Sequence, residues 1–335
     1  MKALVRYEDK AGSWRVEDRD RPVPGPGEVL IRVAYAGICG SDLHMYRGVF
    51  IVPGQFVSGH EFSGTVAQLG ESVSGFEPGE PVTVEHTYCT CGSCRVCLRG
   101  DYQLCSSRES IGFDHDGAFA EYVVVNPRYI HRLPEGVALS WGALTEPLAC
   151  AVHAVRMVRP EPSDRVLVVG PGPIGLLTAM VFRAYNARVD IVGTPNDGLR
   201  LETARALGIT VIDSAGDEGY SIVAECSGSA GGMNAALKAV EKGGSYLQVG
   251  IAGKPVTIDF DQPLYKELKM FGTYCHRYED WEIALDLMAR GLVNVEPLIS
   301  RTVALEDWEQ ALEDLEAQKA IKVLIEFEGE DHEES

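Results

Sequence analysis

Short apolar runs, separated by Gly and Pro, dominate the first 155 residues of the chain. The runs are rich in β-branched residues and are bounded by turn residues, a pattern typical of strands joined by turns. Examples are GEVLIRVAYAG, SGTVAQLG, EPVTVEH and GAFAEYVVVN. We therefore predict a mostly β domain over residues 1–155.

From Arg165 onward, the apolar runs alternate with segments of helical periodicity. VLVVG is followed by PIGLLTAMVFRAY, and RVDIVG by GLRLETARALG; the series continues to SYLQVG. Consecutive strand and helix units require right-handed crossovers, which place helices on both faces of a parallel sheet. The pattern predicts an α/β fold whose second domain, residues 156–290, is a doubly wound parallel sheet.

After Lys269 the pattern predicts two further pairs of a strand and a helix, and then a final strand. They are MFGTYC with DWEIALDLMARG, ISRTVAL with EDWEQALEDLEAQ, and AIKVLIEF. We expect residues 291–335 to return to the first domain. The acidic end EFEGEDHEES is expected to be a solvated, frayed terminus.

Four cysteines form a C-x2-C-x2-C-x7-C ladder at Cys91, Cys94, Cys97 and Cys105. Structural zinc prefers four thiolates in a closed tetrahedral shell, and two-residue gaps let a short loop wrap successive sulfurs around one ion. The alternative is that these cysteines fill gaps or pair as disulfides, which rarely produces such close spacing. We predict a structural zinc site.

A glycine motif, GPGPIG, follows the apolar strand VLVVG and opens a helix. The first Gly makes a tight turn, the second lets the backbone approach a pyrophosphate, and the third lets the helix pack on the strand. The helix N-terminus then attracts the phosphates. We predict that a dinucleotide binds at Gly170, Gly172, Pro173, Ile174 and Gly175.

The acidic residue that usually binds the adenosine ribose is missing from the end of the next strand. The segment RVDIVGTPND offers Gly193 and Thr194 there, with Arg200 further on. A Gly leaves room for a 2′-phosphate, a Thr can donate a hydrogen bond to it, and an Arg can balance its charge. We expect NADP on this basis; the alternative is NAD, with Asp190 or Asp197 on its ribose.

A second set of metal-binding residue types lies among glycines of the β-rich domain. Cys39 in GICGSDLH, with His60 and Glu61 in SGHEFSG, supplies a thiolate, an imidazole and a carboxylate. Glu146 in LTEPLAC is a fourth candidate, because a buried carboxylate needs a cation or hydrogen bonds, and Cys150 is its rival. Each residue alone also fits a structural role, but the set predicts a second zinc.

These motifs together resemble the zinc-containing medium-chain dehydrogenase/reductase family, and most closely its branch of polyol, sugar and threonine dehydrogenases. The likeness runs from the first strand to about residue 327. It is carried by GICGSDLH, GHEFSG, the cysteine ladder, DGAFAEYVVV, TEPLACAVHA and GPGPIG. It implies a GroES-like catalytic domain that carries both metals, then a Rossmann domain, then a C-terminal segment that returns to the catalytic domain.

The resemblance also implies roles for single residues. The catalytic zinc is expected on Cys39, His60 and a glutamate, with Glu61 and Glu146 sharing that role directly or through water. In the alcohol dehydrogenase branch a cysteine near the domain border is the third protein ligand, and the EPL motif that stands there favours the polyol branch. Ser41 and His44 fall where the family keeps its proton relay, so Ser41, His44 and Glu61 are the expected catalytic residues.

The activity implied is hydride transfer between NADP or NAD and a secondary alcohol of a polyol, sugar or cyclitol, with two zinc ions per chain. The nearest alternative is an L-threonine 3-dehydrogenase. Others are a zinc-free quinone or enone reductase and a non-enzymatic nucleotide-binding protein. Candidates for the wall of a substrate cleft are Tyr46, Phe50, Phe113, Tyr274 and His276.

The charge and composition of the chain limit the classes of binding partner and the compartment that we expect. The net charge of −19, from 30 basic and 49 acidic residues, would repel nucleic acid and anionic membrane surfaces. No apolar run is long enough to span a membrane, and MKALVRYEDK lacks the apolar core of a signal peptide. The odd number of cysteines, nine, favours a reducing compartment, so we expect a cytoplasmic protein. The family resemblance implies a homo-oligomer, a dimer or a tetramer.

Overall fold

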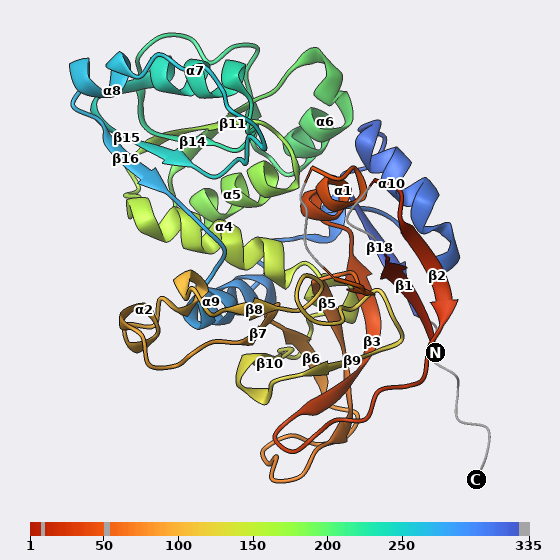
Figure 1. The fold of residues 1–335 in the computed structure, drawn as a ribbon. Coiled ribbons are helices and arrows are strands. Elements are labelled where there is room, and N and C mark those ends of the chain that lie inside the picture. The colour runs from red at the N-terminus through yellow and green to blue at the C-terminus, as the bar shows by residue number, and fades with distance from the viewer. Residues whose placement is uncertain (8–10, 50–53, 328–335) are drawn as a thin grey trace. The chain divides into compact units, whose positions relative to one another are not determined.

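The structure is a computed structural model that describes residues 1–7, 11–49 and 54–327 (Figure 1). Its internal contacts define two compact units, one of Met1–Glu146 with Ile299–Ser335 and the other of Pro147–Leu298. The first border between the units lies inside helix α4 (Thr145–Val158). The predicted cleft residue Phe50 and residues 328–335 of the predicted acidic tail lie outside the described residues.

The first unit is built on a mostly antiparallel sheet in the order β10-β6-β5-β3-β18-β17, and β9 also pairs with β3. A three-stranded sheet in the order β2-β1-β4 and a ribbon of β7 and β8 complete its strands among the described residues. The strand bounds are β1 Lys2–Arg6, β2 Trp14–Asp18, β3 Val29–Gly37, β4 Phe56–Val57, β5 Glu61–Leu69, β6 Pro81–Val84, β7 Thr87–Cys89, β8 Glu109–Ser110, β9 Tyr122–Val125, β10 Ile130–Arg132, β17 Ile299–Val303 and β18 Lys322–Glu326.

Short helices connect these strands. Their bounds are α1 Gly40–Tyr46, α2 Arg95–Leu98, η1 Tyr102–Leu104, η2 Pro127–Tyr129, α3 Leu139–Gly142, η5 Leu305–Asp307 and α10 Trp308–Glu316. Helix α10 is amphipathic: its buried side chains recur at helical spacing, because Trp308, Ala311, Leu312 and Leu315 share one face that joins the core of this unit. The C-terminal segment is therefore part of the first unit, where β18 pairs antiparallel with β3 and Leu324 lies opposite Gly37.

The second unit holds a six-stranded sheet in the order β13-β12-β11-β14-β15-β16, and every strand pair in it is parallel. This order confirms the prediction of an α/β fold with a doubly wound parallel sheet. The bounds are β11 Arg165–Val169, α5 Pro173–Ala184, β12 Arg188–Val192, η3 Pro195–Asp197, α6 Gly198–Ala206, β13 Thr210–Val211, β14 Tyr220–Glu225, α7 Ala230–Ala239, β15 Val240–Gln248, α8 Asp261–Tyr265, β16 Lys269–Gly272, α9 Tyr278–Ala289 and η4 Glu296–Leu298.

The register of this sheet brings three loops together at one edge. Val169 at the end of β11 lies opposite both Val192 of β12 and Glu225 of β14. The loops that follow these three strands begin at Gly170, Gly193 and Cys226. The carboxyl ends of the strands therefore present the glycine motif and its neighbours on one side, where open α/β sheets bind ligands.

Two predicted elements differ in length from those observed. The helix predicted in GGMNAALKAVEKGG ends at Ala239, because Val240 is extended and pairs with Tyr220 of β14. The strand predicted in MFGTYC ends at Gly272. In both cases the strand pairing within the sheet, which local periodicity does not reveal, determines where the element stops.

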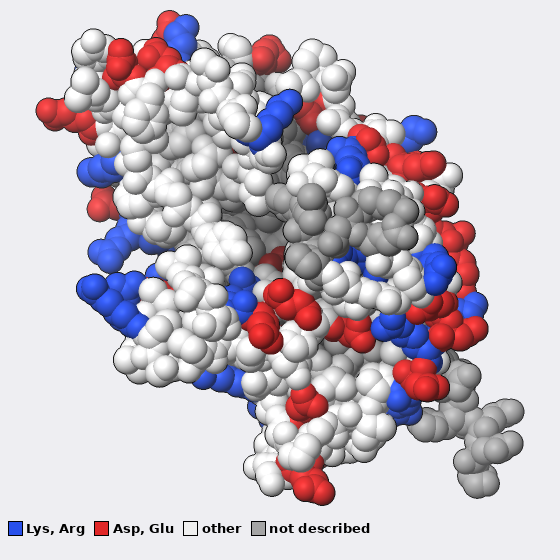
Figure 2. All heavy atoms as spheres, in the orientation of Figure 1, with Lys and Arg blue, Asp and Glu red and all other residues white. Residues whose placement is uncertain are grey.

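Acidic side chains are spread over both units and are interspersed with basic ones on the face shown in Figure 2. Within the described residues, no helix combines the length and apolar character that crossing a membrane requires.

Candidate functional site

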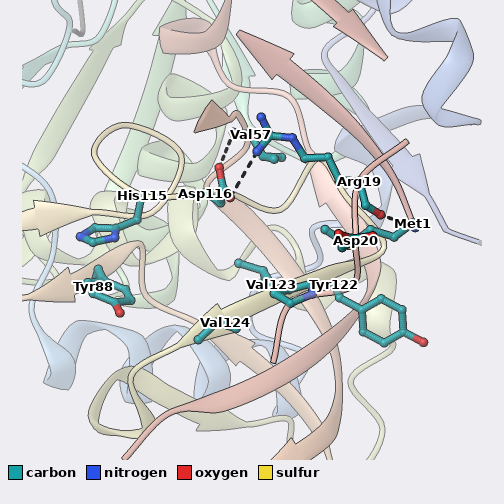
Figure 3. A pocket seen from close by; sticks show the side chains of 11 residues that line it. Met1, Arg19, Asp20, Val57, Tyr88, His115, Asp116, Tyr122, Val123 and Val124 are labelled. Atoms are coloured by element: carbon teal, nitrogen blue, oxygen red, sulfur yellow. Dashed lines mark hydrogen bonds and ion pairs between the residues drawn. The ribbon is translucent and has the colours of Figure 1, made fainter. Parts of the chain in front are cut away.

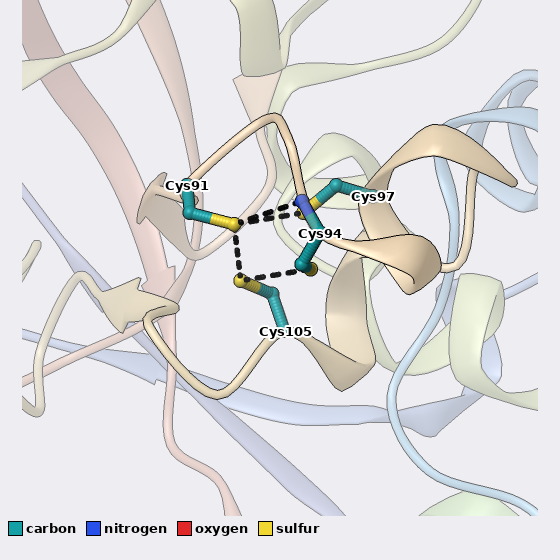
Figure 4. A group of neighbouring side chains, drawn as sticks. All are labelled: Cys91, Cys94, Cys97 and Cys105. Carbon is teal, nitrogen blue, oxygen red and sulfur yellow. Dashed lines mark hydrogen bonds between the residues drawn. The ribbon is translucent and has the colours of Figure 1, made fainter.

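The four cysteines of the ladder converge in the first unit (Figure 4). Cys91 Sγ lies 3.6 Å from Cys105 Sγ and 3.9 Å from Cys97 Sγ, and Cys94 Sγ lies 3.9 Å from Cys105 Sγ. A tetrahedron with zinc–sulfur bonds of about 2.3 Å has edges of about 3.8 Å, so these spacings fit one zinc ion. Backbone N–H groups of Ser93 and Cys94 lower the pKa of the Cys91 thiol to about 6, which favours the thiolate that a metal binds.

The cysteine lobe, residues 91–105, is attached to the sheet by a buried carboxylate. The hydroxyl of Tyr102 in η1 donates a hydrogen bond to the carboxylate of Glu85, whose two oxygens lie 2.6 and 2.8 Å away. His131 of β10 lies 3.1 Å from the same carboxylate through its Nε2. Because Glu85 directly follows β6, this network ties the lobe to the central sheet.

The second predicted donor set also comes together in the first unit. Ligand atoms of Cys39, His60 and Glu61 all lie within 4.8 Å of one another. Cys39 caps helix α1, while His60 and Glu61 stand at the start of β5. A thiolate, an imidazole and a carboxylate at this separation form a donor set that zinc accepts.

Two glycines lie beside this donor set at positions where a larger side chain would clash. Gly59 has a φ of +96°, and a Cβ there would lie 2.5 Å from the ring of Phe119. Gly37 lies opposite Glu61 in the sheet, and a Cβ at Gly37 would lie 2.5 Å from Glu61 Oε2. Both positions therefore exclude larger residues, which explains why the motif is surrounded by glycine.

Asp42 lies beside His60. Its Oδ2 accepts a hydrogen bond from the backbone N–H of Cys39 at 2.8 Å, and its Oδ1 lies 3.6 Å from His60 Nδ1. A carboxylate on one imidazole nitrogen leaves the other nitrogen for a metal.

His60 is buried in a strongly negative environment. Burial lowers its pKa, but the charges of Asp42 and Cys39 outweigh that effect and raise the pKa to about 10. The position therefore favours a positive charge, which either a proton or a metal ion can supply.

Lys322 is a partner of the donor set that sequence analysis did not find. Its ammonium donates to Glu61 Oε1 at 2.8 Å and Oε2 at 2.6 Å, and to the carbonyl oxygen of Ile38 at 3.0 Å. Burial lowers the pKa of Lys322, but the carboxylate of Glu61 more than compensates and the pKa is raised. The sequence signal was a charged residue inside the apolar strand AIKVLIEF, which requires a buried partner.

Glu146 does not belong to the group of Cys39, His60 and Glu61 whose donor atoms meet within 4.8 Å. Its Oε1 lies 3.2 Å from Nδ1 of His86, another residue that sequence analysis did not single out. The ring of His86 stands edge-on to the ring of His60, with centroids 5.6 Å apart. Glu146 is thus connected to the neighbourhood of His60 through His86.

The predicted relay residues lie on one face of α1. Ser41 Oγ is 3.3 Å from His60 Nε2, the nitrogen that Asp42 leaves for a metal. His44 follows three residues later, the spacing that places two side chains on the same side of a helix. Burial and the nearby Arg47 lower the pKa of His44, so its imidazole is neutral at pH 7 and can accept a proton.

The glycine motif of the second unit has the geometry of a pyrophosphate cradle. A Cβ at Gly175 would lie 1.9 Å from the carbonyl oxygen of Gly170, and Gly170 itself has a φ of +100°. A Cβ at Gly172 would meet no described atom within 4 Å, so this position borders open space. Pro173 and Ile174 then begin α5, whose N-terminus faces the loop. The cradle fits the phosphates of a dinucleotide.

At the ribose end of this loop, Asp197 joins the predicted residues. Its Oδ2 accepts hydrogen bonds from the backbone N–H and the hydroxyl of Thr194, at 2.8 and 2.7 Å, and its Oδ1 accepts one from Arg200 at 3.2 Å. Asp190 instead accepts a hydrogen bond from Tyr220 at 2.8 Å. A Cβ at Gly193 would lie 2.8 Å from the ring of Pro171, so this glycine is required by the loop packing as well.

Two of the predicted cleft residues have different surroundings. Phe113 lies against His60, with ring centroids 4.9 Å apart. Tyr46 packs instead with Trp14 and Trp308, at centroid distances of 5.8 and 5.5 Å, as part of the core of the first unit. Phe113 therefore borders the donor set, whereas the ring contacts of Tyr46 are with the core of the first unit.

A separate cavity of about 350 Å³ opens in the first unit (Figure 3). Its lining includes Arg19, Tyr88, His115 and Asp116. Asp116 accepts a hydrogen bond from the backbone N–H of Val57 at 2.8 Å and lies 3.5 Å from Arg19. None of the predicted metal ligands lines this cavity, so it is distinct from the donor set around His60.

Two family models match the chain: the alcohol dehydrogenase GroES-like domain over residues 25–135 and the zinc-binding dehydrogenase domain over residues 173–290. The sorbitol dehydrogenase of Halalkalibacterium halodurans is 38% identical over 97% of this chain and 99% of its own length. The D-arabitol-phosphate dehydrogenase of Enterococcus avium is 36% identical over 94% of both chains. A solved structure of a Sinorhizobium meliloti protein bound to NADP has a TM-score of 0.89 and 30% identity, covering 97% of this chain and 99% of that one.

Proposed function

Because the chain belongs to the zinc-containing medium-chain dehydrogenase family, we propose that it interconverts a secondary alcohol of a polyol, sugar or cyclitol and its ketone. It is an NAD(P)-dependent oxidoreductase with a zinc cofactor. The observation that carries the assignment of the site is the convergence of Cys39, His60 and Glu61 within 4.8 Å, beside the hydroxyl of Ser41.

In this proposal Cys39, His60 and a glutamate hold the catalytic zinc, and the four ladder cysteines hold the structural one. Zinc bound to the first set supplies Lewis acidity, which favours loss of the proton from an alcohol. Lys322 fixes the carboxylate of Glu61 by ion pairing with both oxygens. This contact supports a role for Glu61 that depends on its negative charge beside the metal, with Glu146 as the alternative carboxylate.

Ser41 and His44 would carry the proton. The Ser41 hydroxyl lies 3.3 Å from His60 Nε2, so it can accept a proton from a substrate hydroxyl bound next to that nitrogen. His44, whose pKa is lowered, is neutral and can take the proton from Ser41 and pass it to solvent. The carbon that bears the deprotonated oxygen would give its hydrogen as hydride to the nicotinamide ring, which leaves a ketone.

The preference for NADP is part of the proposal. Thr194 and Arg200 stand where the ribose phosphate is expected, and both are held by Asp197. Arg200 would exchange part of its contact with Asp197 for the 2′-phosphate. The competition from Asp197 weakens this preference, and NAD remains the second cofactor.

We also propose that the protein is a cytoplasmic homo-oligomer. All nine cysteines are free thiols in the structure, which fits a reducing compartment. Five large apolar side chains that are strongly exposed fall in one part of the second unit: Ile251, Phe260, Leu264, Tyr265 and Met270. Met270 lies on β16, an edge strand, and such an edge offers unpaired backbone groups to a second copy of the chain.

The function is tested by steady-state kinetics on the purified full chain with polyols, aldoses, cyclitols and L-threonine, each with NAD and NADP. We expect turnover of at least one polyol, sugar or cyclitol. Turnover of L-threonine alone would contradict the substrate class. Light scattering on the same sample measures the oligomeric state.

A further inference from the structure

His86 lies between the two predicted metal sites. It takes no part in the proposed proton or hydride transfer. It follows Glu85 at the end of β6 and precedes β7, and it is buried. On one side its Nδ1 lies 3.2 Å from Glu146 Oε1. On the other side its Nε2 lies 2.6 Å from Nη2 of Arg108.

The Arg108 contact fixes the tautomer of His86. A guanidinium group has donors only, so Nε2 of His86 must accept the hydrogen bond from Arg108. The proton of the neutral ring is then on Nδ1, which donates it to Glu146. In this arrangement His86 acts as a donor to a carboxylate.

Arg108 in turn is fixed by the cysteine lobe. Its backbone N–H donates to the carbonyl oxygen of Cys105, the last cysteine of the ladder, at 3.1 Å. Its Nε donates to Thr87 Oγ1 at 3.0 Å, and Thr87 of β7 pairs with Ser110 of β8. The backbone N–H of Ile111 donates to the carbonyl oxygen of His86 at 2.7 Å. The segment after Cys105 thus holds both the side chain and the backbone of His86.

We propose that His86 is a positioning residue for Glu146. Arg108 connects His86 to the cysteine lobe, so the orientation of His86 depends on that lobe. The chain of contacts runs from Cys105 through Arg108 and His86 to Glu146, and each step is a hydrogen bond or ion pair within the first unit. The inference rests on the proposed role of Glu146 at the catalytic zinc. It gives the cysteine lobe, residues 91–105, a function beyond stability, because the lobe would help to set the orientation of Glu146.

The test uses the full-length enzyme with cobalt in the catalytic site and zinc left in the four-cysteine site. The variants are His86→Leu, His86→Asn, Arg108→Gln, Glu146→Gln and the double variant His86→Leu with Glu146→Gln. The side-chain amide of Asn can replace the Nδ1 donor of His86, whereas Leu cannot, so these two form a matched pair. Two quantities are measured: the visible absorption of the bound cobalt and its rate of transfer to a chelator.

We expect His86→Leu to speed cobalt loss by about 10-fold or more and to change the absorption, since removing an outer partner of a metal ligand has effects of this size. His86→Asn should restore most of the wild-type behaviour, and Arg108→Gln should lie between the two. The double variant should resemble Glu146→Gln alone, because His86 acts through Glu146. If His86→Leu does not fold, the Arg108→Gln and His86→Asn variants still provide the comparison.

The outcomes separate this proposal from the one it rests on. If Glu146→Gln holds cobalt as the wild type does, the assignment of Glu146 fails and the role of His86 fails with it. If Glu146→Gln loosens cobalt but neither His86→Leu nor Arg108→Gln does, only the positioning role is overturned. Additive effects in the double variant would also overturn it, since His86 would then act independently of Glu146.

Discussion

Lys322 and Glu61 form a buried ion pair across 261 positions of sequence, with the ammonium 2.8 and 2.6 Å from the two carboxylate oxygens. The pair links β18, near the C-terminus, to the start of β5, where His60 and Glu61 lie. The return of the C-terminal segment therefore places a positive charge directly behind a carboxylate of the predicted catalytic zinc site.

Replacing Lys322 with Met should destabilise the first unit by about 3–5 kcal/mol, because Glu61 would be left buried without a countercharge. Denaturant unfolding of the full chain measures the change. Removing the charge from both partners, in Lys322→Met with Glu61→Gln, should recover most of the loss. Lys319→Met, at an exposed position three residues earlier, is the control and should change stability by less than about 0.5 kcal/mol. An equal loss in the single and double variants would contradict the role of the pair.

Stability of the second unit should depend on the ionisation of Asp280 in α9. Burial alone raises its pKa, but His153, Arg156 and the backbone N–H of Arg277 outweigh burial, so the pKa is lowered. A lowered carboxylate pKa contributes stability above the unfolded pKa of about 4, and that contribution is lost as the pH falls through the lower folded pKa.

Asp280→Asn should therefore cost about 1–3 kcal/mol at pH 7 and progressively less below about pH 4. Thermal unfolding of wild type and variant at several pH values measures this difference. Asp286→Asn, on the exposed side of the same helix, is the control and should be nearly neutral throughout. A cost that is the same at all pH values would show that the charge of Asp280 is not the cause.

The cofactor preference can be tested at Arg200. Arg200→Gln should raise the KM for NADP by about 10-fold or more and leave that for NAD nearly unchanged, because only NADP carries the 2′-phosphate. Arg205→Gln, exposed on the same helix, is the matched control. Equal effects on the two cofactors would argue that Arg200 supports the loop and does not bind the phosphate.

A substitution of Asp197 tests the cofactor preference in the opposite direction. Asp197→Asn can still accept the backbone N–H of Thr194 but no longer attracts Arg200 as a charge, so the ratio of NADP to NAD activity should rise. Gly193→Asp is a poorer probe, since a Cβ at this position would lie 2.8 Å from Pro171 in the glycine motif. An unchanged ratio in Asp197→Asn would contradict the proposed competition.

Proton transfer is tested at Ser41. Ser41→Ala should lower kcat by about 100-fold or more while the zinc content stays unchanged, because the hydroxyl moves a proton and is not needed to bind the metal. Kinetics with the substrate found in the screen, together with metal analysis, measure both quantities. Nearly full turnover in Ser41→Ala would exclude it from the relay.

The sequence predicted the parts of the site that depend on local spacing. The cysteine ladder lies within 15 consecutive residues, so its convergence follows from the loop itself. The glycine motif follows its strand directly, and the strand order of the sheet then confirmed the doubly wound fold. In these cases a short segment contains nearly all the information.

The partners of the site were harder to predict because they come from distant segments. Lys322 reaches Glu61 through strand pairing, and Arg108 reaches His86 through the β7 and β8 ribbon. Tyr46 packs against Trp308, which approaches only after the C-terminal segment returns. Long-range pairing of this kind leaves no periodic signal in the chain.

Zinc analysis of the purified full chain tests the central claim most directly, with Cys39→Ala and His60→Ala measured beside the wild type. The account predicts two zinc ions per chain in the wild type, and one zinc with no dehydrogenase activity in each variant, with the fold retained. One zinc in the wild type, or two zinc ions and full activity in either variant, would contradict a catalytic metal held by Cys39 and His60.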